Sequence, residues 1–297
     1  MARRRRGRKI DGWLVLDKPA GMTSTAALGA VKRLAQPIKA GHGGTLDPLA
    51  TGVLPIGLGE ATKAMAYMLN SDKAYDFTLR WGIATDSDDA EGAVVAEGGP
   101  VPNAAAIASV LGDFRREIDQ VPPVYSAVKL EGQRAYDLAR AGATVTLAPR
   151  RVRIDRLDLV EAAGTTARFS LACSKGTYVR ALARDLARAL GTHAHIVALR
   201  RTRAGPFDQK PAITLEKLEA LRHKGLMDQA ILPIATGLAD IPALAVTGNE
   251  AARLRAGQSL TLPTAVEGTA RITQDDTLIA IAEVVQGCAR PLRVFNL

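Results

Sequence analysis

The sequence predicts an α+β fold, with a large body of interspersed strands and helices and a small C-terminal β module. Apolar and polar residues alternate along residues 75–83, as in a strand with one buried face. Along residues 24–35 and 179–190 the apolar residues instead recur every three or four positions, as on the buried face of a helix. Beyond residue 242, glycines separate short apolar runs, which is typical of a small β module.

In chain order, the first expected strand covers residues 13–16 and leads through a Pro-Ala-Gly turn into a helix. Ser24 or Thr25 is expected to cap this helix. Two adjacent prolines exclude a helix through residues 120–129, so we expect an ordered extended loop there. Further strands are expected at residues 53–56, 75–83, 151–159, 166–173 and 195–201, and further helices after Asn103, near residues 133–140, from residue 179 and at residues 214–221.

The basic charge of the chain is concentrated in two places. The formal net charge is +9, and six of the first nine residues are Arg or Lys. Residues 168–210 carry nine more Arg and Lys residues against two Asp. A basic arm and a separate basic segment favour a polyanionic partner, most simply nucleic acid, over a basic face that only meets solvent.

The sequence argues against several classes of protein. Cys173 and Cys288 have no CxxC spacing, so neither a disulfide framework nor a cysteine metal site is expected. His193 and His195 lack a third ligand at suitable spacing, and residues 86–91 lack the glycine and one oxygen ligand of a calcium loop. No apolar run approaches about 20 residues, and no apolar stretch follows the first arginines as in a secretory signal. We therefore expect a cytoplasmic protein.

The most unusual stretch is residues 41–63, where Asp47 stands among glycine, small and apolar residues. Pro48 biases Asp47 toward an extended conformation, and the glycines allow positive φ and a close approach to a ligand. A half-buried Asp is costly unless it is paired or does chemistry. On composition alone, a reactive carboxylate and the cap of an Asp-Pro turn are equally good interpretations.

Two further residues suit a functional site. Tyr75 is the first inward residue of its strand, so its hydroxyl is placed to open onto a cleft, although a core tyrosine is an equal alternative. Arg180 follows a strand–turn junction in the first turn of a helix, where a cation opposes the helix dipole. It therefore requires an anionic partner, for which Asp47 is a candidate, unless it belongs to a surface row with Arg184 and Arg188.

Six stretches together resemble the bacterial TruB family of tRNA pseudouridine-55 synthases. They contain G-H-G-G-T-L-D-P-L-A-T-G around Asp47, V-P-P-V-Y-S-A-V-K, and C-S-K-G-T-Y-V-R ending at Arg180, in the order that the family has. Members often carry Thr-Gly-Ala where this chain has Gly43-Gly44-Thr45, a departure that leaves Asp47 in place. The matching stretches are residues 12–24, 41–63, the strand of Tyr75, 121–140, 173–186 and 195–201.

The resemblance implies a pseudouridine-synthase-type fold, with a mixed, mostly antiparallel sheet flanked by helices. It also implies a division of the chain. A basic flexible arm is expected at residues 1–9, and a catalytic domain at residues 10–240 with an RNA-contacting insertion at 121–150. A PUA-like RNA-binding module is expected at residues 241–297.

The resemblance further implies roles for single residues. Asp47 matches the catalytic carboxylate, Arg180 the residue that pairs with it, and Tyr75 the ring that stacks on the base. His42 matches the residue that fills the space left by flipped bases. The other expected substrate contacts are Tyr178, Leu199, Lys18 and Lys63.

The implied reaction converts uridine to pseudouridine at position 55 in the T loop of tRNA, with no cofactor and no metal. The implied partner is the T stem-loop of tRNA, with no membrane and no obligate protein partner, and the enzyme is expected to be a monomer. Two alternatives stay open. One is a non-catalytic tRNA-binding or folding protein of the same shape, and the other is an enzyme that acts on a free nucleotide.

Overall fold

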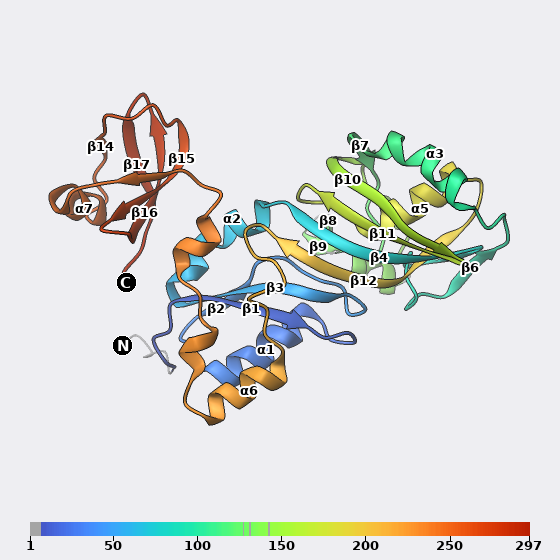
Figure 1. Ribbon diagram of the computed structural model, residues 1–297, viewed down its shortest axis with the longest axis horizontal. Helices are drawn as coiled ribbons and strands as arrows, with labels where there is room; N and C mark the ends of the chain where they lie inside the picture. Colours follow the sequence, from blue (N-terminus) through green and yellow to red (C-terminus); the bar gives the residue numbers. More distant parts are fainter. Residues whose placement is uncertain (1–6, 127, 131, 142) are drawn as a thin grey trace. The chain divides into compact units, whose positions relative to one another are not determined.

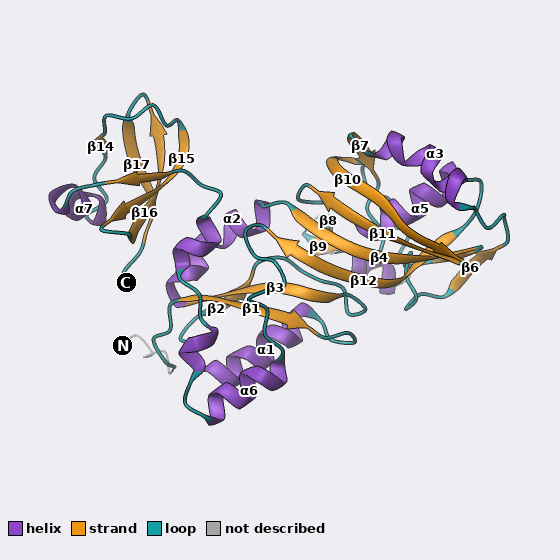
Figure 2. Cartoon of the chain, in the orientation of Figure 1, coloured by secondary structure: helices purple, strands orange, loops and turns teal. Residues whose placement is uncertain are grey.

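The computed structural model describes residues 7–126, 128–130, 132–141 and 143–297 (Figure 1). Strands and helices are interspersed along the chain, as Figure 2 shows, and the α+β class predicted from the sequence is confirmed. The expected basic arm lies largely outside the described residues. The chain forms two compact units. Unit 1 comprises the described residues up to Pro48, Gly52–Ser71 and Arg203–Leu297, and unit 2 comprises Leu49–Thr51 and Asp72–Thr202.

The N-terminal part of unit 1 is a short antiparallel sheet with helices. Its elements are β1 (Gly12–Lys18), α1 (Ser24–Ala35), β2 (Ala40–His42), β3 (Thr51–Leu58), η1 (Gly59–Ala64), α2 (Met65–Asn70), α6 (Leu215–His223), η2 (Met227–Ala230) and η3 (Ile234–Leu238). β1 pairs with β3 over its whole length, and β2 pairs with the second half of β3. α1 and α6 pack on each other, and α6 also contacts β1. The loop between β2 and β3 is therefore anchored at both ends by one sheet.

The expectation that Ser24 or Thr25 caps α1 is wrong. The cap is Thr23, whose hydroxyl accepts a hydrogen bond from Ala26 N–H at 3.1 Å. This hydroxyl satisfies one of the backbone amides that a helix start leaves unpaired. Ser24 is buried, and its hydroxyl bonds to the backbone of Leu46 instead.

The C-terminal part of unit 1 is a small β module, as the glycine spacing predicts. Its elements are β13 (Ala243–Ala245), α7 (Gly248–Arg255), β14 (Leu260–Thr261), β15 (Gly268–Gln274), β16 (Thr277–Val285) and β17 (Cys288–Val294). The five strands lie in the order β13-β15-β16-β17-β14, and only the β13–β15 pair is parallel. The module has an apolar core of its own. A second core joins Leu278, Ile281 and Phe295 to Trp13 and Phe207.

Unit 2 is a mostly antiparallel sheet covered by helices. Its elements are β4 (Lys73–Trp81), β5 (Ile83–Thr85), β6 (Val94–Glu97), α3 (Ala104–Phe114), β7 (Glu117–Gln120), β8 (Lys129–Leu130), β9 (Gln133–Arg134), α4 (Ala135–Arg140), β10 (Arg150–Ala163), β11 (Thr166–Cys173), α5 (Val179–Ala189) and β12 (Ala194–Ala204). The main strands lie in the order β12-β4-β11-β10-β7. α3 packs on β10 and on α5, and α5 packs on β4.

The strand predicted at residues 75–83 is confirmed as β4, although it ends at Trp81. Phe77, Leu79 and Trp81 are buried, as the alternation requires. Gly82 then takes a φ of +83°, which an L side chain rarely adopts, and this turn separates β4 from β5. Tyr75 is half-buried at the beginning of the strand.

Candidate active site

Asp47 lies in the loop between β2 and β3, in the part formed by residues 43–48, which we call the Asp47 loop. Gly43 lets this loop lie close to α2, because a Cβ at this position would overlap the side chain of Met68. The Gly43 N–H donates to the Pro55 carbonyl at 2.7 Å. Gly44 has a φ of +133°. The prediction of positive φ is confirmed at Gly44, and the close approach to a ligand stays a prediction.

The residues on both sides of Asp47 are held by side chains. Ser24 Oγ donates to the Leu46 carbonyl at 3.0 Å and accepts from the Leu46 N–H at 2.7 Å. Lys18 is fully buried, and its ammonium donates to the Pro48 carbonyl at 3.3 Å and to two carbonyls of the turn after β1. A backbone N–H from the same turn also donates to the Pro48 carbonyl, at 2.9 Å. The backbone that presents Asp47 is therefore fixed before and after it.

Two other predicted substrate contacts belong to unit 1. His42 ends β2 and is half-buried. Lys63 lies in η1, where its ammonium donates to Glu60 at 2.6 Å and to the Val294 carbonyl at 2.8 Å. Although burial favours the neutral acid, the hydrogen bonds from Lys63 and Asn296 lower the pKa of Glu60 overall. The structure thus shows Lys63 tying η1 to the end of β17, and its contact with a substrate stays a prediction.

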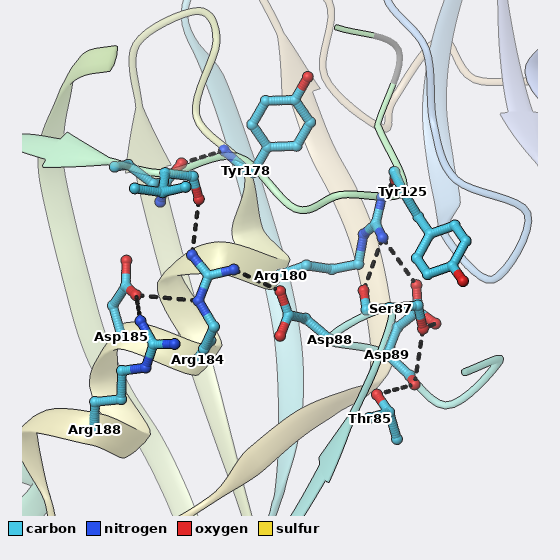
Figure 3. Close-up of polar contacts among 12 residues, drawn as sticks. Thr85, Ser87, Asp88, Asp89, Tyr125, Tyr178, Arg180, Arg184, Asp185 and Arg188 are labelled. Carbon is cyan, nitrogen blue, oxygen red and sulfur yellow. Dashed lines mark hydrogen bonds and ion pairs between the residues drawn. The ribbon is translucent and has the colours of Figure 1, made fainter. Parts of the chain in front are cut away.

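Arg180 occupies the first turn of α5 in unit 2, where its side chain is only 5% exposed. Its guanidinium donates to the Ser87 carbonyl at 2.8 Å and to the Tyr125 carbonyl at 2.9 Å (Figure 3). It also lies 3.5 Å from the buried carboxylate of Asp89. The prediction that Arg180 has an anionic partner is confirmed, and Asp89 is such a partner.

Asp89 belongs to the acidic loop at residues 86–91, which was not among the predicted site residues. Its carboxylate accepts from the Ser87 hydroxyl at 2.5 Å as well as facing Arg180. Asp86 accepts from the Tyr125 hydroxyl at 3.3 Å. The carboxylates of Asp86 and Asp89 thus bind different partners and do not converge on one point, as the ligands of a metal ion would. The signal that could have revealed this role was charge complementarity, since a cluster of acids matches arginines repeating every four residues along a helix.

Arg184 forms a second layer of this network, one helical turn after Arg180. Its three guanidinium nitrogens bond to Asp88 at 2.9 Å, to the Val121 carbonyl at 2.7 Å and to Asp185 at 3.3 Å. Burial raises the pKa of Asp88, although the two neighbouring guanidiniums oppose the shift. Arg188 is different, because its side chain is 71% exposed. Of Arg180, Arg184 and Arg188, only Arg188 therefore fits the alternative of a surface arginine.

The remaining predicted residues lie on separate elements of unit 2. Tyr178 precedes α5, and its N–H donates to the buried Gln120 side chain at 2.8 Å. Leu199 lies in β12 and is buried. Tyr75 stands opposite Leu171 in the β4–β11 pair.

The structure thus assembles two parts of the predicted site, each within one unit. Unit 1 joins the Asp47 loop to Lys18, and unit 2 places Arg180 beside Tyr178 at the beginning of α5. Asp47 and Arg180 belong to different units, so their pairing stays a prediction.

Comparisons with known proteins agree over the whole chain. The N-terminal domain model of the TruB family pseudouridylate synthases matches residues 32–179, and the tRNA pseudouridylate synthase B C-terminal domain model matches residues 180–239. The chain is 52% identical to the tRNA pseudouridine synthase B of Bradyrhizobium diazoefficiens, over 99% of this chain and 88% of that one. It is 47% identical to the protein of the same name from Rhodospirillum rubrum, over the full length of both.

The fold agrees with a solved structure as well. The chain matches a chain in the crystal structure of a Cbf5-Nop10-Gar1 complex with a TM-score of 0.78 and 26% identity, over 96% of this chain and 85% of that one. Fold and relatives together define an RNA pseudouridine synthase, which is an isomerase. Within that class, the chain belongs to the TruB family. Among the residues that the structure describes, no helix is long and apolar enough to cross a membrane.

Proposed function

We propose that this enzyme converts uridine to pseudouridine at position 55 in the T loop of tRNA, with Asp47 as the catalytic carboxylate and without a cofactor. Relatives named tRNA pseudouridine synthase B support tRNA as the substrate. The observation that carries the role of Asp47 is the double anchoring of its loop by Ser24 and Lys18. A reacting group needs such fixed geometry, because small displacements cost large factors in rate.

The proposed reaction is an isomerisation in which atoms and electrons balance within the nucleotide. The N1–C1′ bond breaks, the uracil turns, and C5 forms the new bond to C1′. The proton lost from C5 is matched by one gained at N1, so no water, oxidant or reductant is consumed. Asp47 either attacks C1′ or assists an elimination that leaves a glycal.

The other residues have supporting roles in this proposal. The Arg180 guanidinium offsets the cost of desolvating the Asp47 carboxylate. Tyr75 stacks on the flipped base and accepts a proton, and His42 fills the space that the base leaves. Flipping costs a few kcal/mol, and stacking on an aromatic ring returns about 1–3 kcal/mol per base. The remaining proposed contacts are Tyr178, Leu199, Lys18 and Lys63.

The basic segment at residues 168–210 is proposed to bind the phosphates of the tRNA, and the PUA-like module at 241–297 to bind RNA. The enzyme is proposed to act as a monomer in the cytoplasm. Affinity for tRNA should then fall with salt, with a log–log slope of about −0.7 to −0.9 for each phosphate contacted. An affinity that does not change with salt would contradict the phosphate contacts.

The role of Asp47 is tested by Asp47→Asn, which keeps the size of the side chain and removes its charge. We expect pseudouridine formation to fall by at least about a thousandfold, since the group that does the chemistry is lost. The dissociation constant for tRNA should stay within about threefold of the wild-type value, because phosphate contacts dominate affinity. Unchanged conversion would remove Asp47 from the mechanism.

The substrate is tested by comparing full tRNA, an isolated T stem-loop and free UMP. We expect conversion of both RNAs and none of UMP. Equal rates with UMP and the stem-loop would favour an enzyme of free nucleotides. Binding of tRNA without conversion would favour a non-catalytic tRNA-binding or folding protein.

A further inference from the structure

Residues 120–125, which we call the root segment, comprise the last residue of β7 and the first residues of the proposed insertion at 121–150. This segment contains two prolines and is clamped to the first half of α5 (Figure 3). Three hydrogen bonds make the clamp: Tyr178 N–H to Gln120 Oε1 at 2.8 Å, Arg184 Nη2 to the Val121 carbonyl at 2.7 Å, and Arg180 Nη2 to the Tyr125 carbonyl at 2.9 Å.

The same two guanidiniums also hold the acidic loop. Arg180 bonds to the Ser87 carbonyl and faces Asp89, while Arg184 pairs with Asp88. Each arginine thus bridges two segments that are distant in sequence, and α5 carries both bridges. In the acidic loop, Asp88 lies between Ser87 and Asp89, the two partners of Arg180. In the root segment, Val121 lies four residues before Tyr125. Arg184 therefore holds both segments that Arg180 contacts.

The setting strengthens the pairing of Arg184 with Asp88, whereas the hydrogen bond to the Val121 carbonyl is exposed. The side chains of Arg184 and Asp88 are only 20% and 12% exposed. Hydrogen bonds with charged partners gain strength where water is largely excluded. The planar guanidinium presents donors in several fixed directions, and here it serves three different partners. A lysine has a single nitrogen and cannot reproduce this arrangement.

We propose that Arg184 is a positioning residue that, with Asp88 as its counter-ion, clamps the root segment to α5 and keeps Arg180 in the arrangement that the reaction needs. The effect of Arg184 on the reaction rests on the proposed function, whereas its role in clamping the root segment does not. Removal of Arg184 releases the Val121 carbonyl and leaves Asp88 without its closest cation. The Tyr125 carbonyl is then held less firmly against Arg180.

The test compares Arg184→Met with the matched control Arg115→Met. Like Arg184, Arg115 bonds to carboxylate and backbone carbonyl oxygens within unit 2, here one of each at Asp158 and Leu157, and its side chain is 45% exposed. Three quantities are measured for each variant: amide hydrogen exchange of the peptide 119–137 without RNA, the single-turnover rate at saturating tRNA, and the dissociation constant of tRNA.

For Arg184→Met we expect exchange about tenfold faster and a single-turnover rate about tenfold slower, because the root segment loses one charged hydrogen bond, at the Val121 carbonyl. The tRNA dissociation constant should change by less than about threefold, since phosphate contacts set most of it. Arg115→Met should match the wild type in all three. Arg184→Lys is the second variant, should Arg184→Met fail to fold. It keeps a cation beside Asp88, and it should retain the melting temperature while its rate stays at least about threefold low.

Equal behaviour of the Arg184 and Arg115 variants would overturn the proposal. Faster exchange with an unchanged rate would also overturn it, because the clamp would then be structural and not positioning. If the wild type converts no uridine in tRNA, the proposed function fails, and the exchange comparison still decides whether Arg184 clamps the root segment.

Discussion

The two units hold their central residues in different ways. In unit 1, Asp47 is presented by a backbone that Ser24 and Lys18 grip on either side. In unit 2, Arg180 is held by its own head group, which meets two carbonyls and the carboxylate of Asp89. Anchoring the neighbours places a residue through its backbone. Anchoring the head group in a charged network makes the residue depend on its counter-ions, so the two units should respond differently to substitution.

The largest loss of stability is expected where the charged network is cut. Arg180→Met leaves Asp89 buried without this cation, so the free energy of unfolding should fall by about 3–5 kcal/mol. Urea denaturation at neutral pH measures the change. The double variant Arg180→Met/Asp89→Leu should recover much of the loss, because it removes the uncompensated charge. A loss below about 1 kcal/mol in the single variant would show that Arg180 does not depend on this network.

A smaller effect is expected where the neutral anchor is cut. Ser24→Ala leaves the buried N–H and carbonyl of Leu46 without their hydroxyl partner, which should cost about 1–3 kcal/mol. The single-turnover rate should fall with the loss of loop geometry. Thr25→Ala changes the next, exposed position of the same helix and serves as the control. Equal stability and rate of the two variants would show that the Asp47 loop is held by other contacts.

A pH-dependent effect is expected from a further charge of unit 2. Burial, followed by the nearby Arg201, lowers the pKa of Lys73 to about 8 from 10.5. Between these values the unfolded chain binds a proton that the folded chain has lost, so the contribution of Lys73 to stability rises with pH. Lys73→Met should therefore be more stable than the wild type near neutral pH, and the difference should shrink as pH increases through this window. A difference that does not change with pH would contradict the lowered pKa.

The sequence predicted single local features of both arrangements, but neither the anchoring by Ser24 and Lys18 nor the partner of Arg180 by name. The positive φ at Gly44 in the Asp47 loop was predictable, because glycine allows it whatever the rest of the fold. The position of Arg180 at the beginning of a helix was also local, and it correctly implied an anionic partner. The pairing of Arg180 with Asp89 could not be predicted in the same way. It depends on how a loop before α3 folds back onto α5, and no local pattern encodes that contact.

Ser24 shows why a local rule can fail. A hydroxyl residue at a helix start predicts a cap, and three such residues stand together at positions 23–25. The tertiary fold assigned the cap to Thr23 and used Ser24 to hold Leu46. The choice among the three depends on the loop of Asp47, which lies in a later part of the chain. The β module was predictable because glycine-spaced strands are a local signal.

The most direct test of the central claim is to map pseudouridine at single-nucleotide resolution in unmodified tRNA incubated with and without the wild-type protein. We predict that pseudouridine appears at position 55 in the T loop only in the sample with protein and without any added cofactor. Modification at another position, or no modification of tRNA at all, would contradict the proposed function.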